Sequence, residues 1–204
     1  MKKRGILILG IIWAGSVGFG LAMLYNYENE PSVAGIVSRE WPAFIKVRPN
    51  ERFFHLVMTA HPHCPCTRAS VSELSRIMAH TQGKLKAHIL FQRPQGSAED
   101  WVKTDLWKNV EKIPGVEAII DDEGKQAKAL GATTSGQTFL YDHTGSLIFH
   151  GGITGARGHE GDNAGHSTVV ALVNGQKTDT TQTPFFGCFL HNQPQIPELA
   201  ETRR

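Results

Sequence analysis

Residues 53–67, FFHLVMTAHPHCPCT, decide the fold of this chain. The first eight, 53–60, form a mainly apolar run of strand length, which predicts a strand buried on both faces. Apolar residues then recur at spacings of three and four over 68–80, which predicts an amphipathic helix. Cys64 and Cys66 stand between the two. We therefore expect both cysteines at the junction of a buried strand and a helix N-terminus.

Strand and helix patterns alternate through the rest of the chain. They predict, in order, a strand over 87–91, a helix opened by a Ser97 and Asp100 capping box and ended by Pro114, a strand over 116–121, a helix over 126–130, a hairpin of 137–141 with 146–150, and a last helix capped by Asn163 and stopped by Gly175. Such an order predicts an α/β fold, with a mixed sheet flanked by helices on both faces.

The amino-terminal segment predicts a membrane anchor. Residues 5–24, GILILGIIWAGSVGFGLAML, carry no charge, and as a helix they rise about 30 Å, which matches a bilayer core. Lys2, Lys3 and Arg4 precede them, so the positive-inside rule places the amino terminus in the cytoplasm and the bulk outside it. A cleaved signal sequence is the alternative. The expected organisation is a cytoplasmic tip (1–4), an anchor or signal sequence (5–25), a linker (26–50), a globular domain (51–192) and a polar tail (193–204).

Composition excludes several classes of function. A chain of 204 residues with 40% hydrophobic content has enough apolar residues for one globular domain. The formal charge of +2 becomes −1 without Lys2, Lys3 and Arg4, so no basic face for nucleic acid is expected. Three cysteines are too few for a disulfide scaffold. We expect the paired Cys64 and Cys66 to carry chemistry instead.

A cysteine at a helix N-terminus lies near backbone N–H groups and the positive end of the helix dipole, which lowers its pKa. Cys64 and Cys66 are expected in that position, and His61 and His63 would donate hydrogen bonds to a thiolate when protonated. Pro65 removes one backbone donor and stiffens the spacing of the cysteines.

Cys188 stands in TPFFGCFLH, after the last predicted helix. The chain is free to fold back there, and we expect burial of apolar neighbours to hold the return, namely Phe185, Phe186, Phe189 and Leu190. Cys188 is then a resolving thiol or a third soft metal ligand. The alternative is a buried free cysteine with a packing role.

Four separated segments carry a resemblance to a known family: HPHCPCTRASVSEL (61–74), SGQTFLYDHTG (135–145), GGITGARGHEGDN (151–163) and FGC (186–188). Together with the order of strands and helices, they resemble the thioredoxin-like superfamily, and more narrowly the membrane-anchored bacterial proteins called RedB, over about residues 50–192. The resemblance implies a thioredoxin-like sheet and thiol redox work, without naming a substrate.

Two departures from ordinary thioredoxins stand out. Thioredoxins carry CxxC, whereas here Cys64, Pro65, Cys66 and Thr67 give CxC, with Thr67 where the second cysteine would stand. A Cys64–Cys66 disulfide would close a small, strained and oxidising ring. Residues 135–138 align with the place where thioredoxins carry a cis-proline, and they contain no proline. Broad exchange on unfolded proteins is therefore not expected.

The glycine-rich segment 151–165 is the other dense motif. The resemblance implies that this loop lies beside the cysteines, where Arg157 or His159 would stabilise a thiolate or a bound anion. The alternative is a solvated loop in which Arg157 pairs locally with Glu160 or Asp162. The segment lacks the ending of a phosphate-binding P-loop.

The leading hypothesis is a membrane-anchored thiol-disulfide oxidoreductase of the bacterial inner membrane, facing the periplasm, without a cofactor. Its partner would be a protein thiol or disulfide, a small thiol, or a peroxide in a thiol-peroxidase variant. Cys64 attacks and Cys66 or Cys188 resolves. The residues expected to shape the site are His61, His63, Thr67, Arg68 and Arg157.

The main alternative is copper handling, because soft thiolates and imidazoles suit Cu(I). Its expected ligands are Cys64, Cys66, His61 and His159, with Cys188 as a further candidate. A catalytically idle interaction domain is a third hypothesis.

Overall fold

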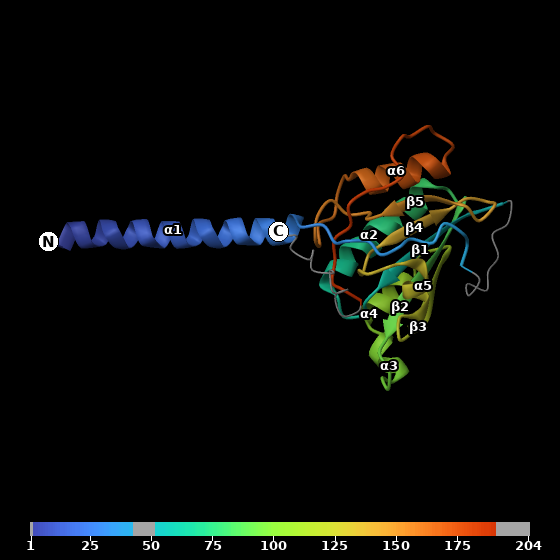
Figure 1. Ribbon diagram of the computed structural model, residues 1–204, viewed down its shortest axis with the longest axis horizontal. Coiled ribbons are helices and arrows are strands. Elements are labelled where there is room, and N and C mark those ends of the chain that lie inside the picture. Colours follow the sequence, from blue (N-terminus) through green and yellow to red (C-terminus); the bar gives the residue numbers. More distant parts are fainter. Residues whose placement is uncertain (1, 43–51, 191–204) are drawn as a thin grey trace, which may run out of the picture. The chain divides into compact units, whose positions relative to one another are not determined.

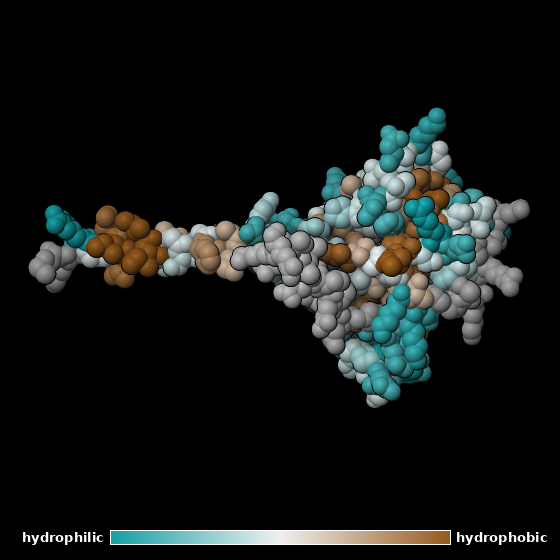
Figure 2. All heavy atoms as spheres, in the orientation of Figure 1, coloured by the Kyte–Doolittle hydropathy of each residue, from teal (hydrophilic) through white to brown (hydrophobic). Residues whose placement is uncertain are grey.

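A computed structural model describes residues 2–42 and 52–190 of the chain. The chain divides into two units, residues 1–30 and 31–204. The first is one helix, α1 (Lys2–Asn29), which is long and apolar enough to cross a membrane. In Figure 2 a strongly hydrophobic band lies near the amino-terminal end of this helix, followed by residues of intermediate hydropathy. The helix extends beyond the predicted 5–25 segment at both ends and stops shortly before Pro31, the first proline of the chain.

The second unit is built on a five-stranded mixed sheet, in the order β3-β2-β1-β4-β5 (Figure 1). The strands are β1 (Phe54–Ala60), β2 (Leu85–Arg93), β3 (Val116–Asp122), β4 (Thr138–Tyr141) and β5 (Leu147–Gly151). β1, β2 and β3 run parallel, while β4 pairs antiparallel with both β1 and β5. The central strand β1 is buried after its first residue, which confirms the expected buried strand.

Helices cover both faces of this sheet, as predicted. The helices are α2 (Pro65–His80), α3 (Glu99–Val102), α4 (Asp105–Val110), α5 (Lys125–Leu130) and α6 (Ala164–Val173). Leu56 and Met58 of β1 belong to a core with α2, α3, α4 and α6. Val57 points to the other side, into a core with α5. The alternation along β1 therefore separates two layers of packing.

The predicted helix after residue 97 is instead two short helices, α3 and α4. The Ser97 amide donates to the Pro94 carbonyl (3.2 Å), so Ser97 belongs to the preceding turn and Ala98 takes the cap position without a side-chain bond. The expected capping box does not form. By contrast, Asn163 caps α6 as predicted, because its side chain accepts a hydrogen bond from the His166 amide (2.8 Å).

Residues 31–42 lie along the domain, as expected for part of the linker. The Ser32 amide donates to the Phe185 carbonyl (2.9 Å), and the Leu147 amide donates to the Arg39 carbonyl (3.0 Å). Trp41 packs edge-on against Tyr141, with ring centroids 5.1 Å apart. The other docking residue expected in the linker, Phe44, lies outside the described residues, as does the predicted tail 193–204.

Candidate active site

Cys64 stands where β1 gives way to α2. The strand ends at Ala60, a turn follows, and Cys64 is the N-cap residue of α2 with an extended backbone. Pro65 starts the helix, where its missing N–H costs no intrahelical bond. The predicted junction is confirmed. Because the first turn of a helix presents unpaired amides, this position favours a negatively charged sulfur.

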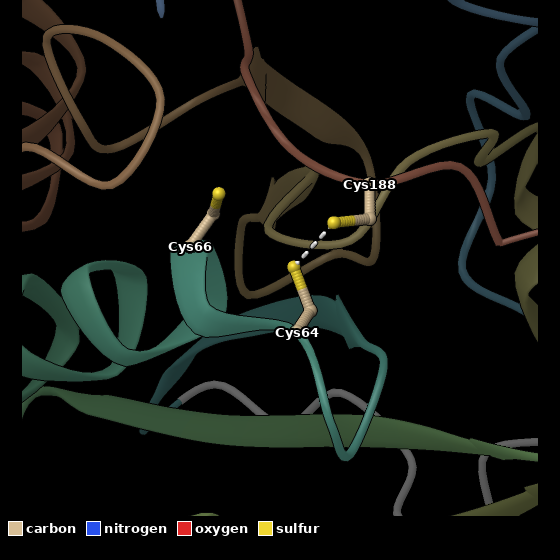
Figure 3. Close-up of side chains that lie close together, drawn as sticks. All are labelled: Cys64, Cys66 and Cys188. Carbon is tan, nitrogen blue, oxygen red and sulfur yellow. Dashed lines mark hydrogen bonds between the residues drawn. The ribbon is translucent and has the colours of Figure 1, made fainter.

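Three sulfur atoms meet at this helix end (Figure 3). Sγ of Cys64 and Sγ of Cys188 are 2.9 Å apart, and these two with Sγ of Cys66 all lie within 4.8 Å of one another. Cys188 is 124 residues from Cys64 in the sequence and reaches it from the segment that follows α6. All three are free cysteines.

The return of the chain to the site follows the expected route in most respects. Phe185 and Leu190 are buried, at 3% and 5% exposure. Phe189 is 42% exposed, so the expected anchoring by this side chain is wrong. Two backbone hydrogen bonds also hold the returning segment in place. The Ser135 amide donates to the Cys188 carbonyl, and the Leu190 amide donates to the Thr133 carbonyl (2.9 Å each).

The three thiols differ in acidity. Burial alone would raise the pKa of Cys64, but hydrogen bonds from Cys188 and Thr67 outweigh it and the net pKa is lowered. Burial and the neighbouring Cys64 charge raise the pKa of Cys66. Burial and the hydrogen bond to Cys64 raise the pKa of Cys188 to about 12. Cys64 is therefore the sulfur that ionises first.

Thr67 supports this arrangement from the first turn of α2. Its hydroxyl lies 2.5 Å from the Ser135 hydroxyl, and both side chains are buried. The Ser135 oxygen also accepts a hydrogen bond from the His61 amide (2.8 Å). The sequence analysis did not predict the hydrogen-bonding role of Ser135, which it noted within a family motif and for the proline missing there. The run of small hydroxyl residues Thr133, Thr134 and Ser135 before a buried strand is a signal from which a packed polar loop could have been predicted.

The imidazoles take other partners than the expected thiolate. The His63 amide donates to Nδ1 of His61 (3.2 Å), and Nε2 of His63 lies 2.9 Å from the Trp101 carbonyl oxygen. Burial and the neighbouring His63 lower the pKa of His61, which disfavours the protonated imidazole. The groups that lower the pKa of Cys64 are Cys188 and Thr67, not the two histidines. Arg68, also expected to shape the site, pairs with Asp105 (2.6 Å) at the surface.

The glycine-rich loop lies against the cysteines, as the resemblance implied. A Cβ atom added to Gly158 would lie 4.0 Å from Sγ of Cys66. Arg157 donates a hydrogen bond to the Gly187 carbonyl, and its charge lowers the pKa of Cys66 and Cys188 by less than burial raises it. Glu160 accepts from Ser72 (2.9 Å) and Arg76 (3.3 Å) of α2.

The donor set for a metal differs from the expected one. Among the residues that the structure describes, the cluster of suitable ligands consists of Cys64, Cys66 and Cys188. His61 and His159 do not belong to it, and His159 is exposed. Three sulfur donors suit a soft ion such as Cu(I).

An open groove of about 520 Å³ adjoins the site. His61, Gln92 and Phe189 are among its lining residues. A larger hollow, of about 740 Å³, is lined by residues such as Arg39, His150 and Leu172, and none of the three cysteines lines either hollow. The first hollow lies nearer the cysteines along the chain, since His61 precedes Cys64 and Phe189 follows Cys188.

No family model and no curated protein matches this chain. Among solved structures, it is similar to a hypothetical protein from Sinorhizobium meliloti 1021, at 21% identity and a TM-score of 0.55, over 80% of this chain and 96% of that one. An uncharacterized conserved protein from Geobacillus kaustophilus gives 16% identity and a TM-score of 0.54, over 82% and 93%. A thioredoxin-like protein solved in its oxidised form gives 11% and 0.48, over 74% and 98%.

At such identities the matches show the fold alone. The narrower resemblance to RedB proteins stays a prediction. Three parallel strands, an antiparallel hairpin and cysteines at the N-terminus of the helix after the central strand form the arrangement that the thioredoxin resemblance implied. The chain has the thioredoxin-like fold.

Proposed function

We propose that this protein is a thiol-disulfide oxidoreductase in which Cys64 and Cys188 form the exchanging pair. The observation that carries the proposal is the 2.9 Å separation of their Sγ atoms at the N-terminus of α2. A disulfide requires an S–S distance of about 2.05 Å, so a small side-chain movement would join them. The lowered pKa of Cys64 supplies the thiolate that exchange requires.

The exchange proceeds in two displacements. The Cys64 thiolate attacks one sulfur of a partner disulfide and forms a mixed disulfide, while the other partner sulfur leaves as a thiolate. Cys188 then loses its proton to solvent and attacks Sγ of Cys64, which releases the second partner sulfur. The partner gains two electrons, and Cys64 and Cys188 become a disulfide. The reverse sequence oxidises a partner dithiol.

Cys188 suits the resolving role better than Cys66. A Cys64–Cys66 bond closes a ring across a single intervening proline, whereas Cys188 approaches from a separate segment without that constraint. Sγ of Cys66 lies within 4.8 Å of the other two sulfurs, which is close enough for Cys66 to act as a second resolving thiol. Burial raises the pKa of both Cys66 and Cys188, so the choice between them rests on ring geometry and not on acidity.

We further propose that α1 anchors the domain in the bacterial inner membrane, with the domain in the periplasm. Support comes from the length and apolar character of α1 and from the three bases that precede its apolar stretch. Disulfides persist in such an oxidising compartment, which a Cys64–Cys188 couple requires.

The test is a redox titration of the full-length protein in detergent, in oxidised and reduced glutathione over a series of potentials. Thiols are alkylated at each potential and counted by mass spectrometry. We expect wild type and Cys66→Ser to lose two alkylatable thiols in one two-electron step, and Cys188→Ser to accumulate a glutathione adduct on Cys64. A Cys188→Ser form that still closes an internal disulfide, or a wild type that never closes one, would contradict the proposal.

A second candidate function is Cu(I) binding, which the three-sulfur cluster favours. Cys64, Cys66 and Cys188 would be the ligands, and their thiols would lose protons on binding. We expect one Cu(I) per reduced chain in competition with a chromogenic chelator, with weaker binding in each single Cys→Ser variant. His61→Asn and His159→Asn are the matched controls, and loss of binding in those forms alone would favour the mixed sulfur and imidazole set.

A further inference from the structure

Two imidazoles meet at the surface between α2 and α6. Nδ1 of His80, the last residue of α2, lies 3.4 Å from Nε2 of His166 in the first turn of α6. His80 is exposed and the side chain of His166 is 15% exposed, so the pair is at the surface. It lies at the opposite end of α2 from Cys64 and takes no part in the proposed exchange.

The separation of the two nitrogens matches a tetrahedral metal ion. Imidazole nitrogens bind Zn²⁺ at about 2.0–2.1 Å. Two such bonds at the tetrahedral angle of about 109° place the nitrogens about 3.3–3.4 Å apart, whereas the right angle of an octahedral ion would place them about 2.9 Å apart. The observed separation of 3.4 Å fits the tetrahedral ion.

Glu73 fixes the proton of His166 on the far side of the ring. Its buried carboxylate lies 2.8 Å from Nδ1 of His166. Since a carboxylate only accepts hydrogen bonds, that nitrogen carries the proton, and in the neutral ring Nε2 holds a lone pair that faces His80. A carboxylate behind the ring is the usual means by which proteins set the tautomer and orientation of a metal-binding histidine.

Both histidines are held in place before any ion binds. The side-chain amide of Asn174, at the end of α6, donates to the His80 carbonyl (3.3 Å). The start of α6, which carries His166, packs closely on the chain after β5, because a Cβ atom added to Gly165 would collide with the Gly152 carbonyl oxygen. An ion therefore meets two nitrogens that are already positioned, which lowers the entropy cost of binding.

Two cations near the pair have other partners. Arg76 donates to Glu73 (3.0 Å), and Lys84 donates to the side-chain oxygen of Asn174 (2.9 Å). His80 lies in the last turn of α2, where the negative end of the helix dipole favours positive charge and offsets the positive end of α6. These contacts weaken the repulsion that an incoming cation would meet.

We propose that His80 and His166 form a binding site for Zn²⁺, in which water fills the remaining positions. Imidazole suits divalent ions of this softness, and the separation of the nitrogens favours tetrahedral Zn²⁺ over ions that require octahedral geometry. The bound ion joins the carboxyl end of the cysteine-bearing helix to α6. The site goes beyond the proposed exchange and does not depend on it.

The test measures Zn²⁺ binding by isothermal titration calorimetry on the full-length protein in detergent at pH 7.5. All three cysteines are replaced by serine in this background, so that the sulfur cluster does not take up the ion. We expect one Zn²⁺ per chain. Binding should weaken by roughly tenfold or more in His80→Asn and in His166→Asn, since even the loss of an outer partner of a ligand costs that much.

The variant that combines His80→Asn with His166→Asn should bind no more weakly than either single variant, because the loss of one nitrogen already breaks the chelate. His61→Asn and His159→Asn are the matched controls, and both should bind Zn²⁺ within about twofold of the parent. A loss that doubles in the combined variant would show two independent imidazoles joined only by a hydrogen bond, and would overturn the site. Equal binding in all variants, or a loss confined to His61→Asn, would overturn it as well.

Circular dichroism checks the fold of the cysteine-free background. If the fold is lost, equilibrium dialysis of the reduced wild-type chain against excess Zn²⁺ decides, with the metal content measured by atomic absorption. The sulfur cluster is then present in every sample and cancels in the comparison. We expect one fewer ion per chain in His80→Asn and in His166→Asn than in His159→Asn, and equal metal content would overturn the site.

Discussion

Glu73 on α2 and His166 on α6 are bound to each other in the interior, with Nδ1 of His166 2.8 Å from a Glu73 carboxylate oxygen. The other carboxylate oxygen accepts from the Gly161 amide (2.7 Å) and from Arg76 (3.0 Å). One buried side chain thus ties the cysteine-bearing helix to the last helix and to the glycine-rich loop that contacts Cys66. The position of that loop depends on this carboxylate.

Glu73→Gln is expected to destabilise the domain by about 2 kcal/mol, because a charged acceptor of three hydrogen bonds is replaced by a neutral amide. Urea unfolding at pH 7 measures the change. Glu111→Gln, at an exposed position, is the control and should stay within about 0.5 kcal/mol of wild type. Equal stability in the two variants would show that the buried carboxylate contributes nothing.

Thr67→Val keeps the shape of the side chain and removes a hydroxyl that stabilises the Cys64 thiolate. We expect the midpoint of the Cys64 titration, followed by thiolate absorbance, to rise. Exchange with oxidised glutathione at pH 7 should slow by roughly tenfold. Thr181→Val, at an exposed position, should change neither quantity. An unchanged midpoint in Thr67→Val would leave Cys188 as the main source of the low pKa.

The resolving step should accelerate with pH. Burial raises the pKa of Cys188 to about 12, so at pH 7 nearly all of it is the unreactive thiol. Since the thiolate fraction of a group grows tenfold per pH unit below its pKa, the mixed disulfide on Cys64 in Cys66→Ser should decay about tenfold faster at pH 8 than at pH 7. Acid-quenched mass spectrometry follows this decay. A rate independent of pH would assign resolution to another group.

His55 links the stability of the domain to pH. Burial, followed by the charges of His88 and His143, lowers its pKa to about 4, whereas the unfolded chain has an ordinary pKa near 6.5. The unfolded chain takes up a proton that the folded one refuses, so this contribution is complete above about pH 6.5 and is lost as pH falls towards 4.

Urea unfolding between pH 7 and pH 4.5 should therefore show a loss of up to about 3 kcal/mol from this group. His55→Phe should flatten that part of the curve, and His159→Asn, at an exposed position, should not. Parallel curves for wild type and His55→Phe would assign the pH dependence to other groups.

Deletion of residues 2–29 is expected to release the protein from the membrane fraction, because α1 is the described helix with the length and hydropathy to span a bilayer. Alkaline extraction followed by immunoblotting measures the release, and the full-length chain is the control. If the undeleted chain is instead recovered in the soluble fraction as a product shorter than 204 residues, residues 5–25 are a cleaved signal sequence.

The strand and helix around Cys64 could be predicted because their signals are local. Apolar runs and spacings of three and four report on one element at a time, so β1, α2 and the Asn163 cap followed from residues close in the chain. The split of the helix after residue 97 could not be predicted in this way, because the Ser97 amide binds the Pro94 carbonyl in the preceding turn.

The tertiary structure decides which residues form the sulfur cluster. The spacing of the cysteines was enough to single out Cys64 and Cys66 as reactive candidates. The approach of Cys188 to Cys64 depends on a contact between segments far apart in sequence. The same is true of the contacts that His61 and His63 make with Trp101. Local pattern reflects the backbone period of each element, whereas side-chain partners depend on how elements pack. For that reason the chain by itself determined where the reactive sulfur stands, and only the folded domain decided which groups surround it.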